Sequence, residues 1–564
     1  MKKITLFLFL FLIGAHNAFA FDFTRPNNKF GIHLAQPHLS DLKKTQELVN
    51  SNRGDWGYIT LVIQENDRSN QKWQEIFDLL REYHLIPIIR LATHPEGTIW
   101  PRPNREEIQN WVDFLDSLHW IVKNRYVILF NEPNHGSEWG GRVDAYDYAE
   151  TAKIFAEKLK AKNSDFFIML GAIDASAPNG MPFYLGEENF FQNFLQKISV
   201  QDFERLFDGL ASHSYPNPAF AGTPWAAGRG TVRSYDWELN LLKNLGVQKN
   251  LPVFITETGW SAERLSRDTI ASYFQTAYES IWLPDERVIA VTPFVLDYQG
   301  EPFLNFSWKQ FQNEEYFSQY YAVQSLSKTQ GEPEQIEKGK ITVDLPKELV
   351  ASSNYHLRVK LKNEGQAIWD KDFGYKISII SNQEKKPVEF FVADLKHIKP
   401  YEEADIDLYI KTNASGKFTS KIILLKKDKT ILEMQDWRFE VVPLPSLDFK
   451  TTLFPKLITQ GENFEIQIFD EKEELVFKRK GLRMNNSISH LNDIQNIIPG
   501  KRYRVVILNP YYLPRQSFMT FKRGTNSIKF KRMFPLDLNN NGHFDSKDMF
   551  ELLNNLELIR LFFP

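Results

Sequence analysis

Through roughly the first 300 residues, short apolar runs alternate with amphipathic segments. The runs have the length of strands buried on both faces of a sheet, and the segments between them have the spacing of helices with one apolar side. The expected strands are residues 31–34, 57–63, 86–91, 126–130, 166–170, 209–212, 252–255 and 288–294. Helices are expected between them, for example at 104–118, 145–162 and 234–245.

Eight strands joined by helical segments predict a (β/α)₈ TIM barrel, which we place at residues 21–328. A doubly wound open sheet is the competing fold. It is disfavoured because no glycine-rich phosphate loop follows the first strand.

The pattern changes after a charged, proline-containing linker at residues 329–340. Period-two alternation takes over, as in residues 355–362, and predicts strands with one buried face. Their regular spacing indicates an immunoglobulin-like β-sandwich at residues 341–442. Residues 363–369 resemble the Asn-x-Gly…Trp turn of immunoglobulin-like accessory modules.

A proline break at Pro443-Leu444-Pro445 begins a second β-rich, sandwich-like module, which we expect at residues 443–532. The remaining residues, 533–564, are expected to form a short EF-hand-like tail. No internal repeat and no long low-complexity segment is visible along the chain.

The N-terminus has the order of a secretory signal peptide. Met1-Lys2-Lys3 precedes an apolar run at residues 4–13, and Ala18-Phe19-Ala20 supplies small residues at a cleavage site. We expect residues 1–20 to be removed by cleavage after Ala20, which predicts a secreted or cell-surface protein. An uncleaved membrane anchor is the alternative, but the run is short for a bilayer, and no later run approaches the ~20 apolar residues of a membrane span.

Cysteine and charge narrow the possible chemistry. The chain has no cysteine, which excludes disulfides and thiolate metal sites. Its formal net charge is −3, and losing Lys2 and Lys3 with the signal peptide makes it more negative. We therefore expect no nucleic-acid partner.

Two glutamates stand at the ends of expected strands. Glu132 follows residues 126–130 and Glu257 follows residues 252–255. Because the carboxyl ends of barrel strands meet at one mouth, we expect the two carboxylates to converge there. Two carboxylates facing one sugar are what cleavage of a glycosidic bond requires. A salt bridge or a helix cap is the alternative for either glutamate alone.

The two segments Asn131-Glu132-Pro133 and Thr256-Glu257-Thr258-Gly259-Trp260 resemble those of the clan A retaining glycoside hydrolases, with families 5 and 39 nearest in style. The resemblance covers roughly residues 28–325. It implies that Glu132 is the general acid/base and Glu257 the nucleophile, and that Asn131 hydrogen-bonds the 2-hydroxyl of the sugar.

Three further candidate site residues stand at or near the ends of expected strands. His213 and Tyr215 resemble the His-x-Tyr segment of the clan, which implies that Tyr215 donates a hydrogen bond to Glu257 and that His213 lines the same subsite. A structural histidine is an equal alternative for His213. Arg90 ends an apolar run and is expected to keep the nucleophile ionised, with a structural ion pair as its alternative.

Tryptophans in loops are candidates for stacking against sugar rings, although each is at least as compatible with packing. Trp260 and Trp308 are the preferred candidates; Trp139 and Trp225 are the others. The last strand lacks the tryptophan that many clan members carry there, and we expect Trp308 to take that place.

The tail contains a calcium-loop pattern. Its oxygen-bearing positions follow EF-hand spacing, with Gly542 at the sharp turn and the carbonyl of His543 as one ligand. The proposed ligands are Asp537, Asn539, Asn541, His543, Asp545 and Asp548. The Asp ending and the single following helix resemble one dockerin repeat, which implies a cohesin-like or cell-surface partner. A polar turn without metal is the alternative.

These features predict a secreted glycoside hydrolase that cleaves a poly- or oligosaccharide with retention, without a catalytic cofactor and with Ca²⁺ in the tail. A non-catalytic carbohydrate-binding protein on a barrel scaffold and a transglycosylase remain alternatives. The sequence does not indicate the sugar, the linkage, or endo versus exo action.

Overall fold

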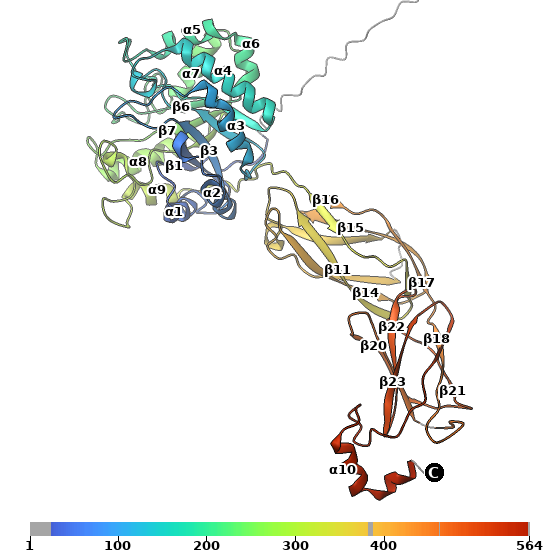
Figure 1. The fold of residues 1–564 in the computed structure, drawn as a ribbon. Helices are drawn as coiled ribbons and strands as arrows, with labels where there is room; N and C mark the ends of the chain where they lie inside the picture. Colours follow the sequence, from blue (N-terminus) through green and yellow to red (C-terminus); the bar gives the residue numbers. More distant parts are fainter. Residues whose placement is uncertain (1–23, 382–386, 462, 562–564) are drawn as a thin grey trace, which may run out of the picture. The chain divides into compact units, whose positions relative to one another are not determined.

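The computed structural model describes residues 24–381, 387–461 and 463–561 (Figure 1). The expected signal peptide lies outside the described residues. The chain divides into two compact units with the boundary between Ile336 and Glu337, inside the expected linker.

The first unit has eight parallel strands that alternate with helices. Strands β1 to β5 form one sheet in sequence order and β6 to β8 form another. Their bounds are β1 Gly31–Leu34, β2 Gly57–Gln64, β3 Leu85–Ala92, β4 Arg125–Leu129, β5 Phe166–Leu170, β6 Leu210–His213, β7 Val253–Glu257 and β8 Val288–Val291.

Backbone contacts join the two sheets into a closed barrel. The amide of Asp208 donates to the carbonyl of Ile168 at 2.8 Å, which connects the approach to β6 with β5. On the other side, Phe30 forms a parallel bridge with Val291, which brings β1 against β8. The prediction of a TIM-barrel-like domain is therefore confirmed.

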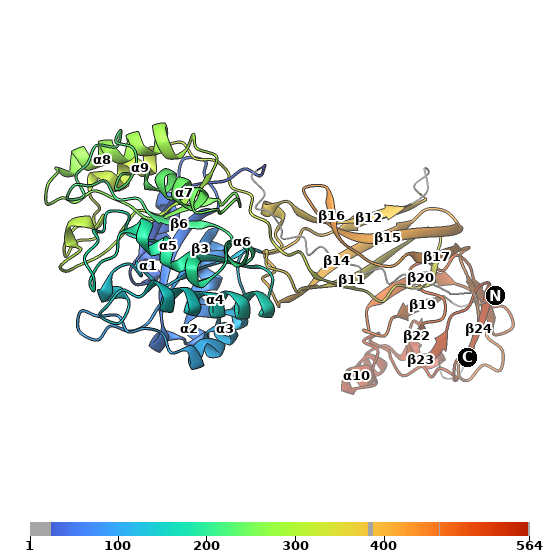
Figure 2. The same ribbon diagram turned by 90° about the horizontal axis from the view of Figure 1, so that it is seen from above.

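The helices surround the strands (Figure 2). They are α1 Leu39–Val49, α2 Asn70–Glu82, α3 Ile108–Ser117, α4 Ala145–Lys162, α5 Glu187–Lys197, α6 Val200–Leu206, α7 Ser234–Asn244, α8 Arg267–Ala277 and α9 Ser318–Ser325. Several begin at a residue whose side chain accepts a backbone N–H from the first turn, which stabilises a helix start by about 1 kcal/mol. These residues are Ser69, Asp144, Ser199 and Ser266.

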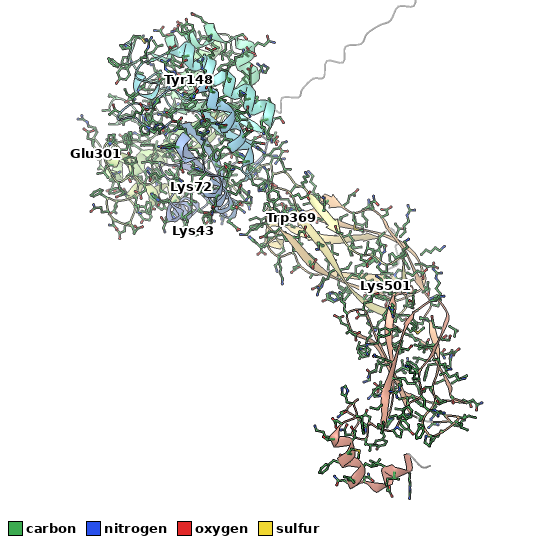
Figure 3. All side chains as sticks on the ribbon, in the orientation of Figure 1. Lys43, Lys72, Tyr148, Glu301, Trp369 and Lys501 are labelled. Carbon is green, nitrogen blue, oxygen red and sulfur yellow. The ribbon has the colours of Figure 1, made fainter. Side chains whose placement is uncertain are left out.

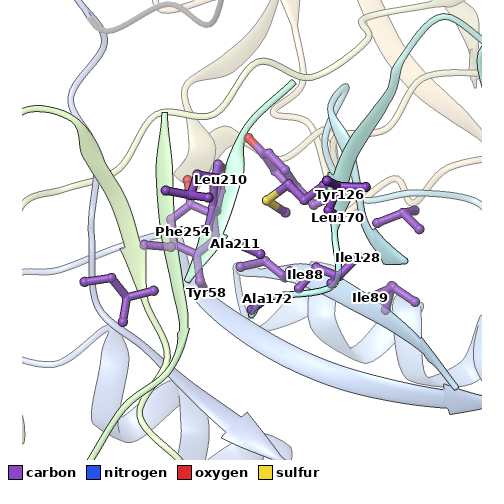
Figure 4. Packing of buried hydrophobic residues seen from close by; sticks show 14 of the residues in the cluster. Tyr58, Ile88, Ile89, Tyr126, Ile128, Leu170, Ala172, Leu210, Ala211 and Phe254 are labelled. Carbon is purple, nitrogen blue, oxygen red and sulfur yellow. The ribbon is translucent and has the colours of Figure 1, made fainter. Parts of the chain in front are cut away.

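The barrel interior is filled by aromatic and branched side chains from several strands (Figure 4). Tyr126 lies within 5.1 Å of Phe167 and 5.2 Å of Phe254 between ring centroids, and Tyr58 packs edge-on against both Tyr126 and Phe254. Removing one such ring typically costs about 3–5 kcal/mol. This rigid interior holds the strand ends in place.

Tyr148 on α4 connects a helix to the ends of two strands (Figure 3). Its buried hydroxyl donates to the carbonyl of Leu129 at 2.9 Å and accepts the amide of Gly171 at 2.7 Å. Leu129 ends β4 and Gly171 follows β5, so this bond pair stabilises the turn that carries the residues after β4.

Six strand ends differ from the expected ones, those of β2, β3, β4 and β6 by one residue, that of β7 by two and that of β8 by three. Strands β6 and β7 extend to His213 and Glu257, and β8 ends at Val291. The apolar pattern stops before His213 and Glu257, yet both remain in the ladder because they pair with each other across β6 and β7. The strands therefore extend directly into the two polar side chains.

The second unit consists of antiparallel-rich sheets. Two sheets, in the orders β13-β14-β11-β9 and β10-β17-β15-β12 with β16 on β15, form its first part. Their bounds are β9 Gly339–Thr342, β10 Glu348–Val350, β11 Ser353–Asn363, β12 Tyr375–Ser381, β13 Val388–Val392, β14 Glu403–Thr412, β15 Gly416–Lys426, β16 Lys429–Glu433 and β17 Trp437–Val442. Trp369 is fully buried in this part (Figure 3).

Two more sheets follow, in the orders β21-β18-β24 and β20-β19-β22-β23. Their bounds are β18 Ser446–Lys450, β19 Phe464–Phe469, β20 Leu475–Leu482, β21 Ile488–Leu491, β22 Arg502–Asn509, β23 Tyr512–Thr520 and β24 Thr525–Lys529. The buried hydroxyl of Tyr355 donates to the carbonyl of Ile497 at 2.9 Å, so the two β-rich parts share one continuous core.

In its described residues, 533–561, the tail contains one α-helix, α10 Ser546–Asn554, and a short 3₁₀ helix at Leu556–Leu561. Within the described residues, no helix has both the length and the apolar character needed to cross a membrane.

Candidate active site

A cavity of about 540 Å³ lies at the carboxyl ends of the barrel strands. The loops after β3 to β8 contribute to it. The lining residues include Arg90, Trp100, Asn131, Glu132, His135, Glu138, Asp174, Tyr215, Phe220, Glu257, Glu263, Phe294, Phe303 and Phe306. This is the end of a parallel barrel at which side chains from separate strands converge.

Glu132 lies on a sharply turned segment after β4. Phe130 and Glu132 have φ angles of 70° and 27°, in the left-handed region that residues with a Cβ rarely adopt. Each such residue costs of the order of 1–3 kcal/mol. The amide of His135 donates to the carbonyl of Glu132 at 2.8 Å and closes the turn. The turn exposes the Glu132 carboxylate to the cavity.

His213 brings the two glutamates together. Its Nδ1 lies 2.7 Å from Oε1 of Glu132 and 3.8 Å from Oε2 of Glu257. Burial lowers the pKa of His213, but the charge of Glu257 and the contact with Glu132 outweigh it and raise the pKa above its ordinary value. His213 is therefore a buried link between the two carboxylates, which stabilise its protonated form.

Glu257 is surrounded by groups that favour its ionised form. The hydroxyl of Tyr215 donates to Oε2 at 3.0 Å, and Nη1 of Arg90 lies 3.4 Å from Oε1. Burial alone would raise the pKa of Glu257, but His213, Arg90 and the Tyr215 hydrogen bond lower it below its ordinary range. Glu257 is thus an ionised carboxylate facing a cavity, as an attacking group must be.

His33 is a further neighbour of the Glu257 carboxylate. Its Nδ1 lies 3.8 Å from Oε1 of Glu257. Burial lowers its pKa to about 3, so His33 is neutral near neutral pH. It therefore acts on Glu257 as a neutral neighbour, and the positive charge comes from Arg90 and His213.

Arg90 also orients Asn131, since its Nη1 donates to the side-chain oxygen of Asn131. With the amide oxygen occupied, the NH₂ group of Asn131 is the end that can donate to another group. The structure thus brings Asn131, Arg90, His213 and Tyr215 together around Glu132 and Glu257.

Glu138 is another carboxyl group in the cavity, and it was not among the residues predicted for the site. Burial, together with the charge of Glu132, raises its pKa to about 7, and Arg90 and a hydrogen bond with Asn131 limit the rise. Glu138 lies on the 3₁₀ turn Gly136–Glu138, six positions after Glu132. No strand-end pattern marks it, because the turn carries it back into the cavity.

Aromatic side chains in the cavity were also missed. Phe220 lies 5.1 Å from Tyr215 and 5.2 Å from Phe306 between ring centroids, and Phe294 lies 5.2 Å from Phe303. Trp100 lines the cavity as well. Phe294 ends an expected strand and the others follow one, which is the one sequence signal that could have indicated them.

The predicted role of Trp260 and Trp308 as sugar platforms is wrong. Their exposed fractions are 2% and 1%, and neither lines the cavity. Both pack edge-on against Phe274 on α8, and the indole N–H of Trp260 donates to the carbonyl of Gly222. They fill the space between α8 and the loops, while Phe294 occupies the cavity wall after β8.

The other two loop tryptophans also differ from each other. Trp139 is fully buried and its N–H donates to Asp147 at 2.9 Å, whereas Trp225 is 62% exposed. Only Trp225 is therefore accessible to a ligand.

The calcium-loop residues are arranged as a turn closed by its own side chains. Asp537 accepts the amide of Gly542 with Oδ2, while its buried Oδ1 has no hydrogen-bond partner within the described residues. Asp548 accepts the amides of Leu538, Asn539 and Asp545. Asp537 therefore offers an oxygen suited to a cation, but both oxygens of Asp548 are already engaged.

The side-chain oxygens of Asn539, Asn541 and Asp545 are also engaged. Asn539 and Asn541 accept backbone amides, and the side-chain amide of Asn541 donates to Asp545 at 3.0 Å. Across the described residues, no group of three or more His, Asp or Glu side chains is placed to hold a metal ion. The donor set fits calcium only in part.

Comparisons with known proteins find neither a matching family model nor a matching curated protein. Similar solved structures include a monomeric beta-xylosidase from Caulobacter crescentus CB15, with 11% identity and a TM-score of 0.39 over 86% of this chain and 96% of that one. An alpha-L-arabinofuranosidase from Thermotoga maritima has 12% identity and a TM-score of 0.37 over 74% and 94%. A beta-mannanase from Thermomonospora fusca has 12% identity and a TM-score of 0.36 over 53% and 92%. At these values the similarity assigns no function to this chain.

Proposed function

We propose that the first unit is a retaining glycoside hydrolase with Glu257 as nucleophile and Glu132 as general acid/base. One observation carries the proposal. Glu132 and Glu257 face the same cavity and both lie next to His213, but of the two only Glu257 is also contacted by Arg90 and Tyr215. Such unequal surroundings are what two carboxylates with separate roles require.

The reaction would proceed in two steps. In the first, Glu257 attacks the anomeric carbon while Glu132 protonates the leaving oxygen, which leaves a covalent glycosyl-enzyme. In the second, Glu132 removes a proton from water, and the water releases the sugar from Glu257. The NH₂ group of Asn131, oriented by Arg90, would donate to the 2-hydroxyl in both transition states.

Retention is supported by the closeness of the two carboxylates. One nitrogen of His213 lies 2.7 Å from Glu132 and 3.8 Å from Glu257. In retaining enzymes the two carboxyl groups are about 5–5.5 Å apart, whereas in inverting enzymes they are about 6.5–9.5 Å apart to leave room for a water molecule. Two carboxylates that both lie next to one histidine nitrogen favour the shorter spacing.

The test is a glycan-panel assay of the full chain beside Glu257→Ala and Glu132→Ala. We expect hydrolysis of at least one glycan by the wild type, its loss in Glu257→Ala, and a first-formed product with the anomeric configuration of the substrate. Glu188→Ala, on the exposed side of α5, is the matched control and should keep full activity. Activity in Glu257→Ala would overturn the nucleophile assignment, and an inverted product would overturn retention.

Product analysis in the same assay separates the alternatives. A sugar acceptor in place of water would give longer products and indicate a transglycosylase. Glycan binding without any turnover would indicate a carbohydrate-binding protein on a barrel scaffold.

Export after cleavage behind Ala20 is a further part of the proposal. It is supported by the positive start, apolar run and small-residue ending of residues 1–20. Sequencing the N-terminus of the protein recovered from the culture medium should give Phe21 first. Recovery of full-length chain only in the membrane fraction would contradict it.

The third part of the proposal is calcium binding by residues 537–548. It is supported by the EF-hand spacing and by the unpartnered buried Oδ1 of Asp537. Ca²⁺ titration of the full chain should protect the tail from proteolysis, and Asp537→Ala should abolish the protection. Equal digestion with Ca²⁺ and with chelator would count against the site and against recruitment of a cohesin-like partner through it.

A further inference from the structure

The second β-rich module differs from the rest of the chain in its charge. Residues 443–532 contain 16 Lys and Arg against 8 Asp and Glu, whereas the whole chain contains 68 against 71. A basic module within a slightly acidic chain predicts an anionic partner for that module. Which partner it is depends on how the cations are placed and on what surrounds them.

Three of these cations line up along β18 and β24. Lys450 and Lys529 stand opposite each other on the two neighbouring strands, and Lys531 follows two residues beyond Lys529. Like charges on neighbouring strands repel each other and cost stability. Within the described residues, none of the three lysines forms an ion pair that would offset this repulsion. An anionic partner would offset it.

Two arginines continue this group of cations toward the loop that follows β18. The guanidinium group of Arg532 donates to the hydroxyl of Thr452 at 3.3 Å and to the carbonyl of Lys456 at 3.5 Å. Arg515 on β23 donates to the carbonyl of Arg532 at 2.9 Å. Neither arginine forms an ion pair with a described residue. The bonds to neutral oxygens therefore hold both guanidinium groups in place without neutralising their charge.

The loop that follows β18 presents aliphatic side chains to the solvent. Leu457 is 84% exposed, the highest value among the large apolar side chains that the structure describes, and Ile458 is 61% exposed. The next residue, Thr459, is fully buried, and its hydroxyl accepts the amide of Leu453 at 3.0 Å. The loop is therefore closed below its tip, and the two aliphatic side chains project from it.

The loop and the arginines rest on the same support. Phe454, at the start of the loop, stacks on Phe534 with 5.3 Å between ring centroids, and the guanidinium group of Arg515 lies 5.7 Å from the Phe534 ring. The amide of Phe454 donates to the carbonyl of Met533 at 2.9 Å. The cations and the aliphatic tip therefore belong to one surface, here called the basic tip. It consists of Lys450, Leu457, Ile458, Arg515, Lys529, Lys531 and Arg532.

The composition of the basic tip distinguishes between two anionic partners. Lysine and arginine are attracted to the phosphates of a lipid surface and equally to the charges of an anionic polysaccharide. Exposed leucine and isoleucine gain nothing from a hydrated polyanion, but they are stabilised when they enter the apolar part of a bilayer. Aliphatic side chains projecting beside cations therefore favour the lipid surface.

We propose that the basic tip docks on an anionic lipid surface. Leu457 and Ile458 enter the layer between the head groups, and the five cations of the tip face the lipid phosphates. The tip lies in the second compact unit and shares no residue with the catalytic cavity. The inference is therefore independent of the proposed hydrolase function and gives the second unit a role of its own.

The experiment is flotation of the full chain with lipid vesicles at low ionic strength. Vesicles of phosphatidylglycerol and phosphatidylcholine in equal parts should carry the wild type upward, and vesicles of phosphatidylcholine alone should not. The doubly substituted Leu457→Ser, Ile458→Ser protein should bind the mixed vesicles about tenfold more weakly. Leu475→Ser, at a 50% exposed leucine on β20, is the matched apolar control and should bind like the wild type.

A second pair of variants tests the position of the charges. Lys529→Gln, Lys531→Gln should also bind the mixed vesicles about tenfold more weakly. The control Lys478→Gln, Lys480→Gln removes the same charge at the same spacing from β20, where both lysines lie near Glu465, and should bind like the wild type. Equal losses in the two lysine proteins would show an effect of overall charge and overturn the assigned surface.

Two further outcomes would overturn the proposal. One is absence of wild-type flotation with the mixed vesicles. The other is binding to both the mixed vesicles and dextran sulfate beads that is unchanged by Leu457→Ser, Ile458→Ser, which would make the partner a polyanion. Thermal unfolding of each variant checks that it is folded. Hydrolysis of a soluble glycan should be the same in all of them, so either proposal can fail without the other.

Discussion

Two pairs of acidic side chains in the described part of the barrel have different surroundings. Glu132 and Glu257 face a cavity and share contacts with His213, and Glu257 is also contacted by Arg90 and Tyr215. Glu187 at the start of α5 and Glu238 on α7 are both 1% exposed and lie against a cavity of about 10 Å³ lined mainly by apolar side chains. Within the described residues, neither forms an ion pair, and neither oxygen of Glu187 has a hydrogen-bond partner.

Glu187 and Glu238 are held protonated, whereas Glu257 is held ionised. Burial raises the pKa of Glu238 to about 8 and that of Glu187 well above its ordinary value, and Glu187 is raised further by the charge of Glu238. In the first pair, cations and a hydroxyl overcome the same burial and lower the pKa of Glu257. Burial by itself makes a carboxyl group neutral, and only its partners make it a usable nucleophile.

The largest expected effect is on activity and separates the two pairs directly. Glu257→Gln keeps the shape of the side chain but cannot attack, so we expect kcat/KM to fall more than 10³-fold. Glu238→Gln should keep activity within about twofold, because Glu238 lies outside the cavity. Steady-state assays on the best substrate measure both. Comparable losses in the two variants would remove the distinction between the pairs.

The second effect is on stability, and here the change is expected at the Glu187–Glu238 pair. The folded state holds the Glu187–Glu238 pair protonated where the unfolded chain, with ordinary carboxyl pKa values near 4.5, is ionised. The folded state therefore binds more protons, and the free energy of unfolding should fall as pH rises from about 4.5 to about 8.

The doubly substituted Glu187→Gln, Glu238→Gln protein lacks this titration and should lose less stability over the same range. Urea unfolding followed by tryptophan fluorescence at pH 5 and pH 8.5 measures the difference. An identical pH dependence in wild type and variant would show that the pair is not protonated in the folded protein.

A smaller effect concerns the partner that keeps Glu257 ionised. Tyr215→Phe removes the hydroxyl 3.0 Å from Oε2, which favours the charged form. The pKa of Glu257 should rise, so the acidic limb of the kcat/KM profile should move to higher pH, with a loss of about 10- to 100-fold at the optimum. A lower kcat/KM with an unshifted acidic limb would mean that Tyr215 acts on the substrate and not on the pKa of Glu257.

The smallest effect concerns Glu138. Its pKa of about 7 means that it becomes negative near neutral pH, beside Glu132. Glu138→Gln removes the carboxyl group that titrates near pH 7, so an inflection of the kcat/KM profile near that pH should disappear. Activity at pH 6 should remain within about tenfold of wild type. A loss as large as that of Glu132→Ala would instead make Glu138 the candidate acid/base.

Local pattern was sufficient for the elements of the barrel. The strand at 166–170 and the helix at 145–162 have the expected bounds in the structure, since apolar runs and a capping Asp144 are readable without any distant contact. The strand ends at His213 and Glu257 were set too early, because their extension depends on pairing between β6 and β7.

The chemistry of individual residues could be predicted less well. Glu132 and Glu257 were identified because each follows an apolar run, and the structure brings them together. Trp260 and Trp308 were misassigned because a tryptophan in a loop has the same local pattern whether it faces solvent or packs on Phe274. Among the four loop tryptophans named as candidates, only Trp225 is exposed, and it was not a preferred one.

The sequence by itself determined where strands and helices begin, and which two glutamates stand at strand ends, because hydrophobic periodicity and capping act over a few neighbouring residues. The tertiary structure decided which carboxyl groups are charged and which aromatic rings are accessible. Those properties depend on desolvation and on partners such as Arg90 and His213, which are distant in the chain and meet Glu257 only when the barrel closes.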